Sequence, residues 1–403
     1  DIRATVNDSS LADKEIAAAS GKSLILDTAN DKFKFSGYRD GTEDKSVLSD
    51  SGLTDAVNDI YTEMYGPSLT DPFTNKAAGA EFMSAVSSLG DAEAVTLLNG
   101  RNEQAGRLIT TPSLAGTQAM NTATTIMTQN VVQRLSEITT PLPSDADVKG
   151  AADAPSNNAW FKMRYTNVDV KAKNYDTSKV ETTNYQLGYD SKIGENAYFG
   201  GYIGTTSGYV ANGAYKTVID KSFQAGLYGT WSLGQGAFIN YIARYGTLTN
   251  KFAGKSWDTK DYGLMLEYGR KIQKRKDLFI TPYVQVDYDH IKTDSVTYAS
   301  GNVVKVDDTN NLDLKLGLNI EQVDDKGGSV YGGIAYGRGL SGSYDAYMNS
   351  LALPNSVNRL NVVYLNFGIK TMMSDASYVD FNIEKTLGDY DGWSLQSKFN
   401  LMF

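Results

Sequence analysis

The last residues of the chain, Gly392 to Phe403, alternate between apolar and polar side chains. Because successive side chains of a strand point to opposite faces, this period of two predicts a β-strand at the C-terminus. An apolar strand at a free sheet edge promotes aggregation, because its N–H and C=O groups lack partners. A closed barrel removes that edge, and in a membrane the apolar row can face lipid. The apolar positions are Trp393, Leu395, Phe399, Leu401 and Phe403.

The same alternation recurs from Ala159 onward and predicts one strand after another. The clearest row runs from Leu312 to Ile320, where every second residue is apolar. We therefore expect about twelve antiparallel strands, an even number, within residues 158–403. The predicted rows begin at Phe161, Tyr185, Tyr198, Phe223, Ile239, Tyr262, Leu278, Leu312, Val330, Val363, Val379 and Trp393.

The predicted connections between these strands alternate in length. Short turns on one rim and long loops on the other are the layout of an outer-membrane barrel, and a soluble β-sandwich needs neither feature. If the last strand ends on the short-turn side, an even number of strands places the start of the first strand there too. The short connections are 192–196, 234–236, 324–328 and 374–376, and the long polar ones are 171–180, 293–308 and 343–358.

A helix is predicted immediately before the strands, from Pro112 to Ile138. Thr111 is a candidate N-cap, and Pro141 and Pro143 end the helical pattern. At about 1.5 Å per residue such a helix is about 40 Å long, enough to cross a membrane. Its side chains are too polar to face lipid. Taken alone, this pattern favours an ordinary surface helix over one in a barrel lumen, but a lumenal helix arriving from the long-loop side leads directly into the first strand.

The inward faces of the predicted strands carry charges of both signs. Charged side chains are expected in a wet lumen or against a helix inside it. We interpret these charges as solvated or helix-binding residues, because they are more often that than catalytic. They include Arg164, Arg244, Glu267, Asp287, Asp313 and Lys315.

The chain before the helix is plainer. Two short strands are predicted at 23–27 and 32–35, as a hairpin or the end of a larger β structure. Helices are predicted at 53–64, 80–89 and 92–98, the last ending at Asn99 and Gly100. Because the chain starts at Asp1 without a signal peptide, we expect a mature or trimmed fragment. The predicted division is 1–50 with short strands, 51–111 as a helical linker region, 112–143 as helix and linker, and 158–403 as the barrel.

Composition limits the chemistry that is available. The net charge is −9 and 21% of the 403 residues are charged, and no apolar stretch approaches the roughly 20 residues of a membrane helix. The absence of cysteine excludes disulfides, thiolate catalysis and cysteine metal sites. The single histidine, His290, is interpreted as structural or solvated. We therefore expect no enzyme activity, no cofactor, no metal and no nucleic-acid partner, while the 26 tyrosines fit the aromatic girdles of a membrane barrel.

The segment from Pro112 to Phe403 resembles the translocator domain of type V autotransporters. The resemblance is carried by the helix end Gln129 to Leu135, the opening strand Trp160 to Tyr165, the glycine- and aromatic-rich strands, and the terminal residues. It implies an all-β fold, a twelve-stranded transmembrane barrel in the bacterial outer membrane with an α-helix in the lumen. It also implies a passenger at the cell surface. The implied site residues are Gln129, Asn130 and Arg134 on the lumenal helix, and Phe399, Leu401 and Phe403 as the signal that the barrel assembly machinery reads.

Some members of the family cut off their own passenger at a pair of asparagines in the helix. The side-chain amide of the first asparagine attacks its own backbone carbonyl. The matching pair in this chain is Gln129 and Asn130. Glutamine has to close a larger and slower ring, and the β-branched Val131 crowds a reaction at Asn130. We predict that this chain does not cleave itself in the lumen.

Three classes of function fit the sequence. The first is a secretion and anchoring barrel, whose partners are outer-membrane lipid, the barrel assembly machinery and its own passenger, an adhesin by resemblance. The second is a porin-like channel, which a plugging helix would make a poor conductor. The third is an enzyme in the barrel, or a surface protease as the passenger. A single histidine and the lack of a nucleophile motif argue against an enzyme in the barrel.

Overall fold

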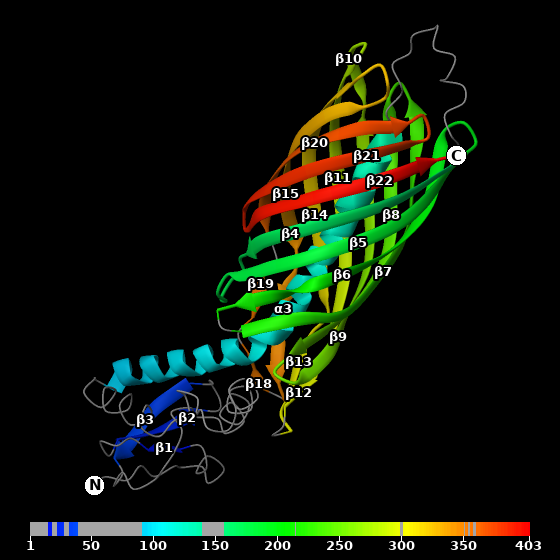
Figure 1. Ribbon diagram of the computed structural model, residues 1–403. Helices are drawn as coiled ribbons and strands as arrows, with labels where there is room; N and C mark the ends of the chain where they lie inside the picture. Colours follow the sequence, from blue (N-terminus) through cyan, green and yellow to red (C-terminus); the bar gives the residue numbers. More distant parts are fainter. Residues whose placement is uncertain are drawn as a thin grey trace.

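The computed structural model of the chain describes residues 15–17, 22–27, 32–38, 91–138 and 157–403, the last range without 214, 299–300, 350, 354 and 358–359. A long helix, α3 (Asp91–Ile138), leads into a β-barrel that closes around it (Figure 1). In the described part of the chain, no helix is both long and apolar enough to span a membrane. The predicted all-β barrel with a helix inside it is confirmed.

The barrel wall consists of twelve long antiparallel strands. A short strand, β10 (Ile272–Arg275), continues β9 beyond Lys271 and pairs with β11. The pairing of β9 with β11 joins the two ends of the sheet, so the barrel is closed. The twelve strands are β4 (Asn157–Val170), β5 (Ser178–Ile193), β6 (Ala197–Asn212), β7 (Tyr215–Gly234), β8 (Ala237–Phe252), β9 (Lys255–Arg270), β11 (Leu278–Thr293), β14 (Thr309–Val323), β15 (Ser329–Ser341), β20 (Asn361–Ser374), β21 (Ser377–Gly388) and β22 (Tyr390–Met402).

The C-terminal strand has no free edge. β22 pairs with β4 along its length, with Phe399 opposite Phe161. The backbones of Asn157 and Phe403 exchange hydrogen bonds of 3.0 and 3.2 Å. The start of the first strand and the end of the last one therefore lie on the same rim, as predicted.

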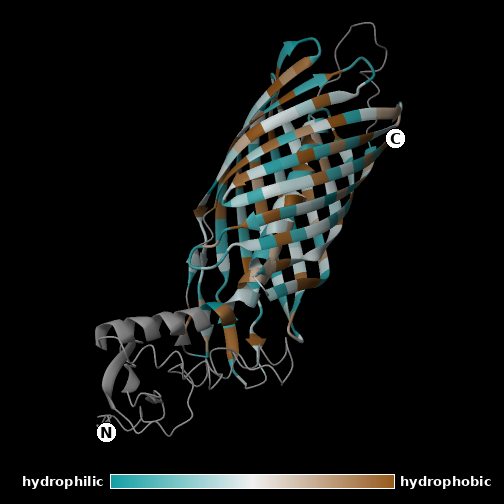
Figure 2. Ribbon diagram, turned by 60° about the vertical axis from the view of Figure 1, so that its left-hand side comes forward, coloured by the Kyte–Doolittle hydropathy of each residue, from teal (hydrophilic) through white to brown (hydrophobic). Residues whose placement is uncertain are grey.

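The two faces of the wall differ in polarity. Apolar side chains such as Leu316, Ile334 and Phe381 are exposed on the outside, while the alternate positions point into the lumen and are buried. Figure 2 shows this as hydrophobic and hydrophilic segments alternating along each strand. A protein that exposes apolar residues around its whole circumference and hides its polar ones is built for lipid surroundings.

The connections follow the predicted layout on one rim and only partly on the other. All five connections on the rim of the C-terminus, which we call the turn rim, are short. On the opposite rim, the loop rim, long loops occur at 171–177, 294–308 and 342–360, but β6 to β7, β8 to β9 and β21 to β22 are joined by at most two residues. The expectation of long loops all around this rim was therefore too broad.

Two of the long loops are folded rather than plain polar segments. They contribute a four-stranded sheet, which we call the collar, made of β12 (Val296–Thr297), β13 (Val303–Val306), β17 (Ala346–Met348) and β18 (Leu351–Ala352). Two further short strands, β16 (Ser343–Tyr344) and β19 (Ser356–Val357), pair with each other within the loop at 342–360.

The segments before the barrel bring one confirmation and one correction. The predicted hairpin is present as β2 (Lys22–Asp27) and β3 (Lys32–Tyr38), with β1 (Glu15–Ala17) beside β2. The predicted helices at 53–64 and 80–89 lie outside the described residues. The predicted helix end at Asn99 and Gly100 and the predicted start at Pro112 are wrong, because α3 runs unbroken through all three residues.

Tertiary packing explains why Pro112 does not begin the helix. A proline in a helix interior removes a hydrogen bond and costs about 3 kcal/mol. Ile109 and Leu114, on either side of it, are buried at the loop rim. Burying each of these side chains contributes about 1.5 to 3 kcal/mol, which offsets the cost of the proline.

Candidate functional site in the barrel lumen

The lumen is filled by the C-terminal part of α3. Between Ile109 and Leu135 almost every side chain of the helix is buried, polar and apolar ones alike. A helix that is buried on all sides needs polar partners for its polar groups. The hydroxyls of Thr110, Thr111 and Thr124 donate to backbone carbonyls of the helix itself. Thr117, Asn130 and Arg134 bond to the inward faces of the strands. Buried polar residues of the helix are Thr110, Thr111, Ser113, Thr117, Gln118, Thr122, Thr124, Thr128, Asn130 and Arg134.

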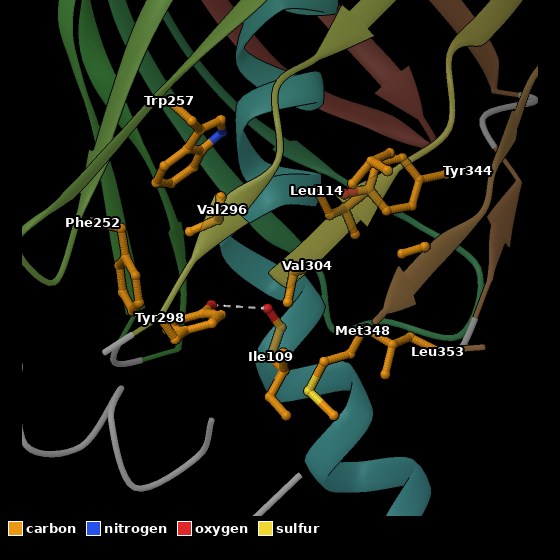
Figure 3. Packing of buried hydrophobic residues seen from close by; sticks show 12 residues of the cluster. Ile109, Leu114, Phe252, Trp257, Val296, Tyr298, Val304, Tyr344, Met348 and Leu353 are labelled. Carbon is orange, nitrogen blue, oxygen red and sulfur yellow. Dashed lines mark hydrogen bonds between the residues drawn. The ribbon is translucent and has the colours of Figure 1, made fainter. Parts of the chain in front are cut away.

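At the loop rim the helix is surrounded by apolar side chains of the collar. Figure 3 shows Ile109 next to Val304, Met348 and Tyr298, all of which belong to one buried cluster. The Tyr298 hydroxyl donates a hydrogen bond of 3.3 Å to the backbone carbonyl of Ile109. The collar therefore closes around the helix where it enters the barrel.

At the turn rim the helix is held by ion pairs. Arg134 donates two hydrogen bonds of 2.8 Å to the carboxylate of Asp190 on β5, with side-chain exposures of 4% and 0%. It donates a third, of 2.9 Å, to the Tyr378 hydroxyl on β21. The next turn of the helix places Glu137 against Lys398 of β22. The Tyr378 hydroxyl also donates a hydrogen bond of 2.5 Å to Glu137. Two cations and two anions are thus paired across the interface.

The carboxylate of Asp190 is further held by residues of the barrel wall. The Tyr228 hydroxyl donates a hydrogen bond of 2.8 Å to it, and the Trp160 indole donates one of 2.7 Å to the Tyr228 hydroxyl. The indole of Trp160 lies directly over Gly188, where any side chain would collide with the ring. Trp160 and Tyr228 also pack against Val131 of the helix in one buried cluster.

Asn130 lies in the middle of this interface and is fully buried. Its amide nitrogen donates to the side-chain oxygens of Gln186, at 3.0 Å, and Asn184, at 3.4 Å. The ammonium of Lys162 donates to the Asn130 backbone carbonyl and, at 3.1 Å, to Gln133. Both acceptors of the Asn130 amide are neutral amides, which cannot take a proton from it. Neither acceptor can therefore serve as the base for an attack by this amide on the chain.

The helix does not fill the whole lumen. Two cavities of about 110 and 80 Å³ lie beside it, facing β11, β14, β15, β20 and β21. Gln129, Gln285 and Lys315 line both of them. The helix packs instead against the strands on the other side of the barrel, where its apolar residues meet Tyr202 and Met265.

The predicted lumenal charges all face inward, but most of them bind the wall rather than the helix. The Arg164 guanidinium donates a hydrogen bond of 2.6 Å to the carboxylate of Glu384. Arg244 pairs with Asp287 at 2.7 Å, with Asp289, and with Asp261 at 3.6 Å. Two of the remaining residues follow the same pattern: Glu267 accepts a hydrogen bond of 2.7 Å from Asn240, and the Lys315 ammonium lies 4.0 Å from the Tyr364 ring. Asp313 instead lines the smaller cavity.

Among the described residues, no group of three His, Cys, Asp or Glu side chains is arranged to hold a metal ion. His290 lies at the loop rim, where its Nδ1–H donates a hydrogen bond of 2.9 Å to the side-chain oxygen of Asn310 and its Nε2 is 3.5 Å from Asp308. The terminal residues Phe399, Leu401 and Phe403 point outward, and the Phe403 ring packs 6.3 Å from that of Tyr189.

The comparison with known proteins agrees with this architecture. The family described as Autotransporter beta-domain matches residues 159–384, more than half of the 403 residues. This chain belongs to the autotransporter family. Autotransporter translocator domains are transport barrels of the bacterial outer membrane that carry a passenger of their own. The apolar outer wall of this barrel is therefore the surface that faces the lipid of that membrane, and the lumenal helix lies inside it.

Individual relatives of this autotransporter are distant. It is 24% identical over 204 residues to the adhesin BmaC autotransporter of Brucella suis biovar 1 (strain 1330), a match that covers 45% of this chain and 6% of that protein. The fold is similar to the translocator domain of NalP from Neisseria meningitidis, at 14% identity and a TM-score of 0.54, covering 70% of this chain and 98% of that one. The transport unit of AIDA-I from Escherichia coli gives 14% identity and a TM-score of 0.50, covering 64% and 92%.

Sequence reasoning missed several residues that meet the helix. Trp160, Tyr228 and Tyr378 belong to inward rows, where bulky aromatic residues are out of place beside water. Their position on the polar face was a readable sign of a helix packed against them. Glu137 and Lys398 carried no such sign, because their pairing joins residues 261 positions apart.

Proposed function

We propose that the barrel supports export of the chain upstream of it to the cell surface and then anchors that chain in the outer membrane. The observation that carries this proposal is the path of α3. The helix passes the collar at Ile109 and reaches the opposite rim at Glu137, close to where β4 begins at Asn157. A chain upstream of Ile109 therefore lies on the loop rim, the side of the cell surface.

In this proposal the helix is the anchor, and Asn130 and Arg134 hold it in place. The ion pairs of Arg134 and the amide bonds of Asn130 join the helix to β5, and Gln129 faces the two cavities. These bonds towards the turn rim, together with the packing of Ile109 in the collar, resist withdrawal of the helix. The lumenal charges of Arg164, Arg244 and their partners keep the wall rigid around it.

The passenger that this barrel would present is an adhesin, and a surface protease is the alternative. The support for an adhesin is the BmaC relative, whose name describes that activity. The outer partners of the barrel are outer-membrane lipid along the apolar wall and the barrel assembly machinery. The outward row of Phe399, Leu401 and Phe403 is the segment that we propose the machinery reads.

The experiment that tests export uses an epitope tag before Asp1 in the full chain, expressed in a Gram-negative host. We expect an antibody to bind intact cells, and external protease to remove the tag while the barrel remains. Heat-dependent mobility on a detergent gel shows that the barrel is folded. A folded barrel whose tag becomes accessible only after the cells are permeabilised would refute export. Deleting 392–403 is the control that prevents insertion.

A porin-like channel is the second candidate, and the two cavities beside the helix favour it. Polar and charged side chains such as Gln285 and Lys315 line both of them. Conductance in planar bilayers separates the two proposals. An anchor conducts poorly until residues 112–138 are deleted, whereas a channel conducts with the helix in place.

A further inference from the structure

The hairpin of β9, β10 and β11 carries a strong local charge. Its tip has five basic residues and one acidic residue within eight positions, in a chain whose net charge is −9. The hairpin projects from the turn rim, at the end of the barrel that also holds the C-terminus (Figure 1). The eight positions are Arg270, Lys271, Ile272, Gln273, Lys274, Arg275, Lys276 and Asp277.

Most of this charge is not neutralised by the protein itself. Arg270, Lys274 and Arg275 are exposed, and none of them forms an ion pair with an acidic side chain of the described residues. Lys271 differs from them, because it turns into the lumen and pairs with Glu321 at 3.1 Å. The carboxylate of Asp277 accepts a hydrogen bond of 2.8 Å from the side-chain amide of Gln322. Three cations on one tip therefore lack an anion.

These cations continue the lipid-facing surface. The outward row of β9 runs through Leu266 and Tyr268, both about half exposed, and its next member is Arg270. Beyond it, Ile272 pairs with the outward Ile280. The outer face of the hairpin thus passes from apolar residues to cations, and long basic side chains at such a boundary reach the phosphates of the headgroup layer.

The other turns of the same rim have the opposite character. The connections at 194–196, 324–328 and 375–376 carry Glu195, Asp324, Asp325 and Asp375, with Lys326 as their one basic residue. The carboxylate of Asp324 accepts hydrogen bonds of 2.8 Å from the backbone N–H groups of Lys326 and Gly328 in its own turn. The basic tip is therefore a local feature of the rim and not a general one.

We propose that this tip is a binding site for an anionic phospholipid of the inner leaflet. The turn rim lies opposite the cell surface, so the lipid that meets Arg270, Lys274 and Arg275 belongs to the periplasmic side. Two arginines can each bind a phosphate through two N–H groups, and the lysine adds a compact third charge. The acyl chains of the same lipid would lie on the apolar row of Tyr268, Ile272 and Ile280. A soluble acidic protein meets the charge but leaves that apolar row without a partner.

The test measures headgroup preference with the full chain in neutral detergent. Native mass spectrometry reports the binding of phosphatidylglycerol and of phosphatidylcholine to the folded barrel. We expect phosphatidylglycerol to bind up to about 100-fold more tightly, because each of three basic residues near an anionic headgroup adds about fivefold. The variant Arg270→Gln with Lys274→Gln and Arg275→Gln should lose this preference, and Lys274→Gln alone should lose part of it.

The matched control removes three exposed lysines from the loop rim, through Lys221→Gln, Lys251→Gln and Lys292→Gln, and should keep the preference. Folding of each variant is checked by heat-dependent mobility. A folded triple variant with the preference intact, or an equal loss in the control, overturns the site. Competition by inorganic phosphate as strong as that by the lipid would assign the tip to a free anion and overturn it too.

A second readout separates lipid from a soluble acidic partner. The chain has no cysteine, so Ile272→Cys gives one position for a spin label. In phosphatidylglycerol nanodiscs the label should be reached by oxygen and shielded from a water-soluble nickel complex. A label that is open to the nickel complex would place the outer face of the hairpin in water, which contradicts the proposal.

Discussion

Replacing Arg134 by leucine is the sharpest test of how the helix is held. The guanidinium is almost fully buried and gives hydrogen bonds to Asp190 and Tyr378. Removing one partner of a buried ion pair leaves an uncompensated charge and costs about 3 to 5 kcal/mol. Asp190 keeps bonds from Tyr228 and Asn158, so we expect the lower half of that range. A cost of about 3 to 4 kcal/mol raises the fraction of barrels with a displaced helix by about 100-fold to 1000-fold.

Planar-bilayer recording measures this fraction directly. The wild-type barrel should open rarely, and Arg134→Leu should open far more often, with the same open conductance as a barrel lacking residues 112–138. The matched control is Arg107→Leu, which changes an arginine of the same helix whose side chain is exposed. It should leave the opening frequency unchanged.

A double variant separates loss of the ion pair from general damage. Asp190→Asn removes the charge that Arg134→Leu leaves behind. The free-energy cost of the double variant, calculated from its opening frequency, should therefore be smaller than the sum of the costs of the two single variants. If Arg134→Leu stays as closed as the wild type, the ion pair does not hold the helix. Strict additivity of the two variants would show that Arg134 and Asp190 act independently, against the geometry.

Four further predictions concern other parts of the molecule. The helix should stay in one piece, because Gln129 closes a larger and slower ring and Val131 crowds a reaction at Asn130; intact-mass analysis of native barrels would contradict this by finding a fragment that begins at Asn130 or Val131. Trp160→Ala should lower the free energy of unfolding by about 3 to 5 kcal/mol in urea titrations, since it empties a buried ring site, and an unchanged midpoint would argue against that packing. Val304→Asp in the collar should open the loop rim and raise conductance, with Lys305→Asp as its exposed control. Deleting Phe403 should slow membrane insertion in pulse-chase labelling while leaving the mature barrel folded, and an unchanged rate would remove its role as a signal.

The strands were predictable because each one records its surroundings locally. A residue such as Leu316 on β14 faces lipid and its neighbour Lys315 faces the lumen, so a period of two is visible without any tertiary information. All twelve rows found in the sequence coincide with barrel strands. The helix ends were not predictable in this way. Local rules end a helix near Gly100 and start one at Pro112, and they do not contain the packing of Ile109 and Leu114 in the collar.

The sequence by itself therefore determined the number of strands, the faces that meet lipid and water, and the closure of the last strand on the first. These properties depend on the alternation of neighbouring residues and on the rule that a sheet edge in lipid must be paired. Only the tertiary structure decided what holds the helix. The pairings of Arg134 with Asp190 and of Glu137 with Lys398 join residues far apart in the chain. Which inward charges meet the helix and which meet one another depends on where the helix lies across the lumen, and no local pattern encodes that position.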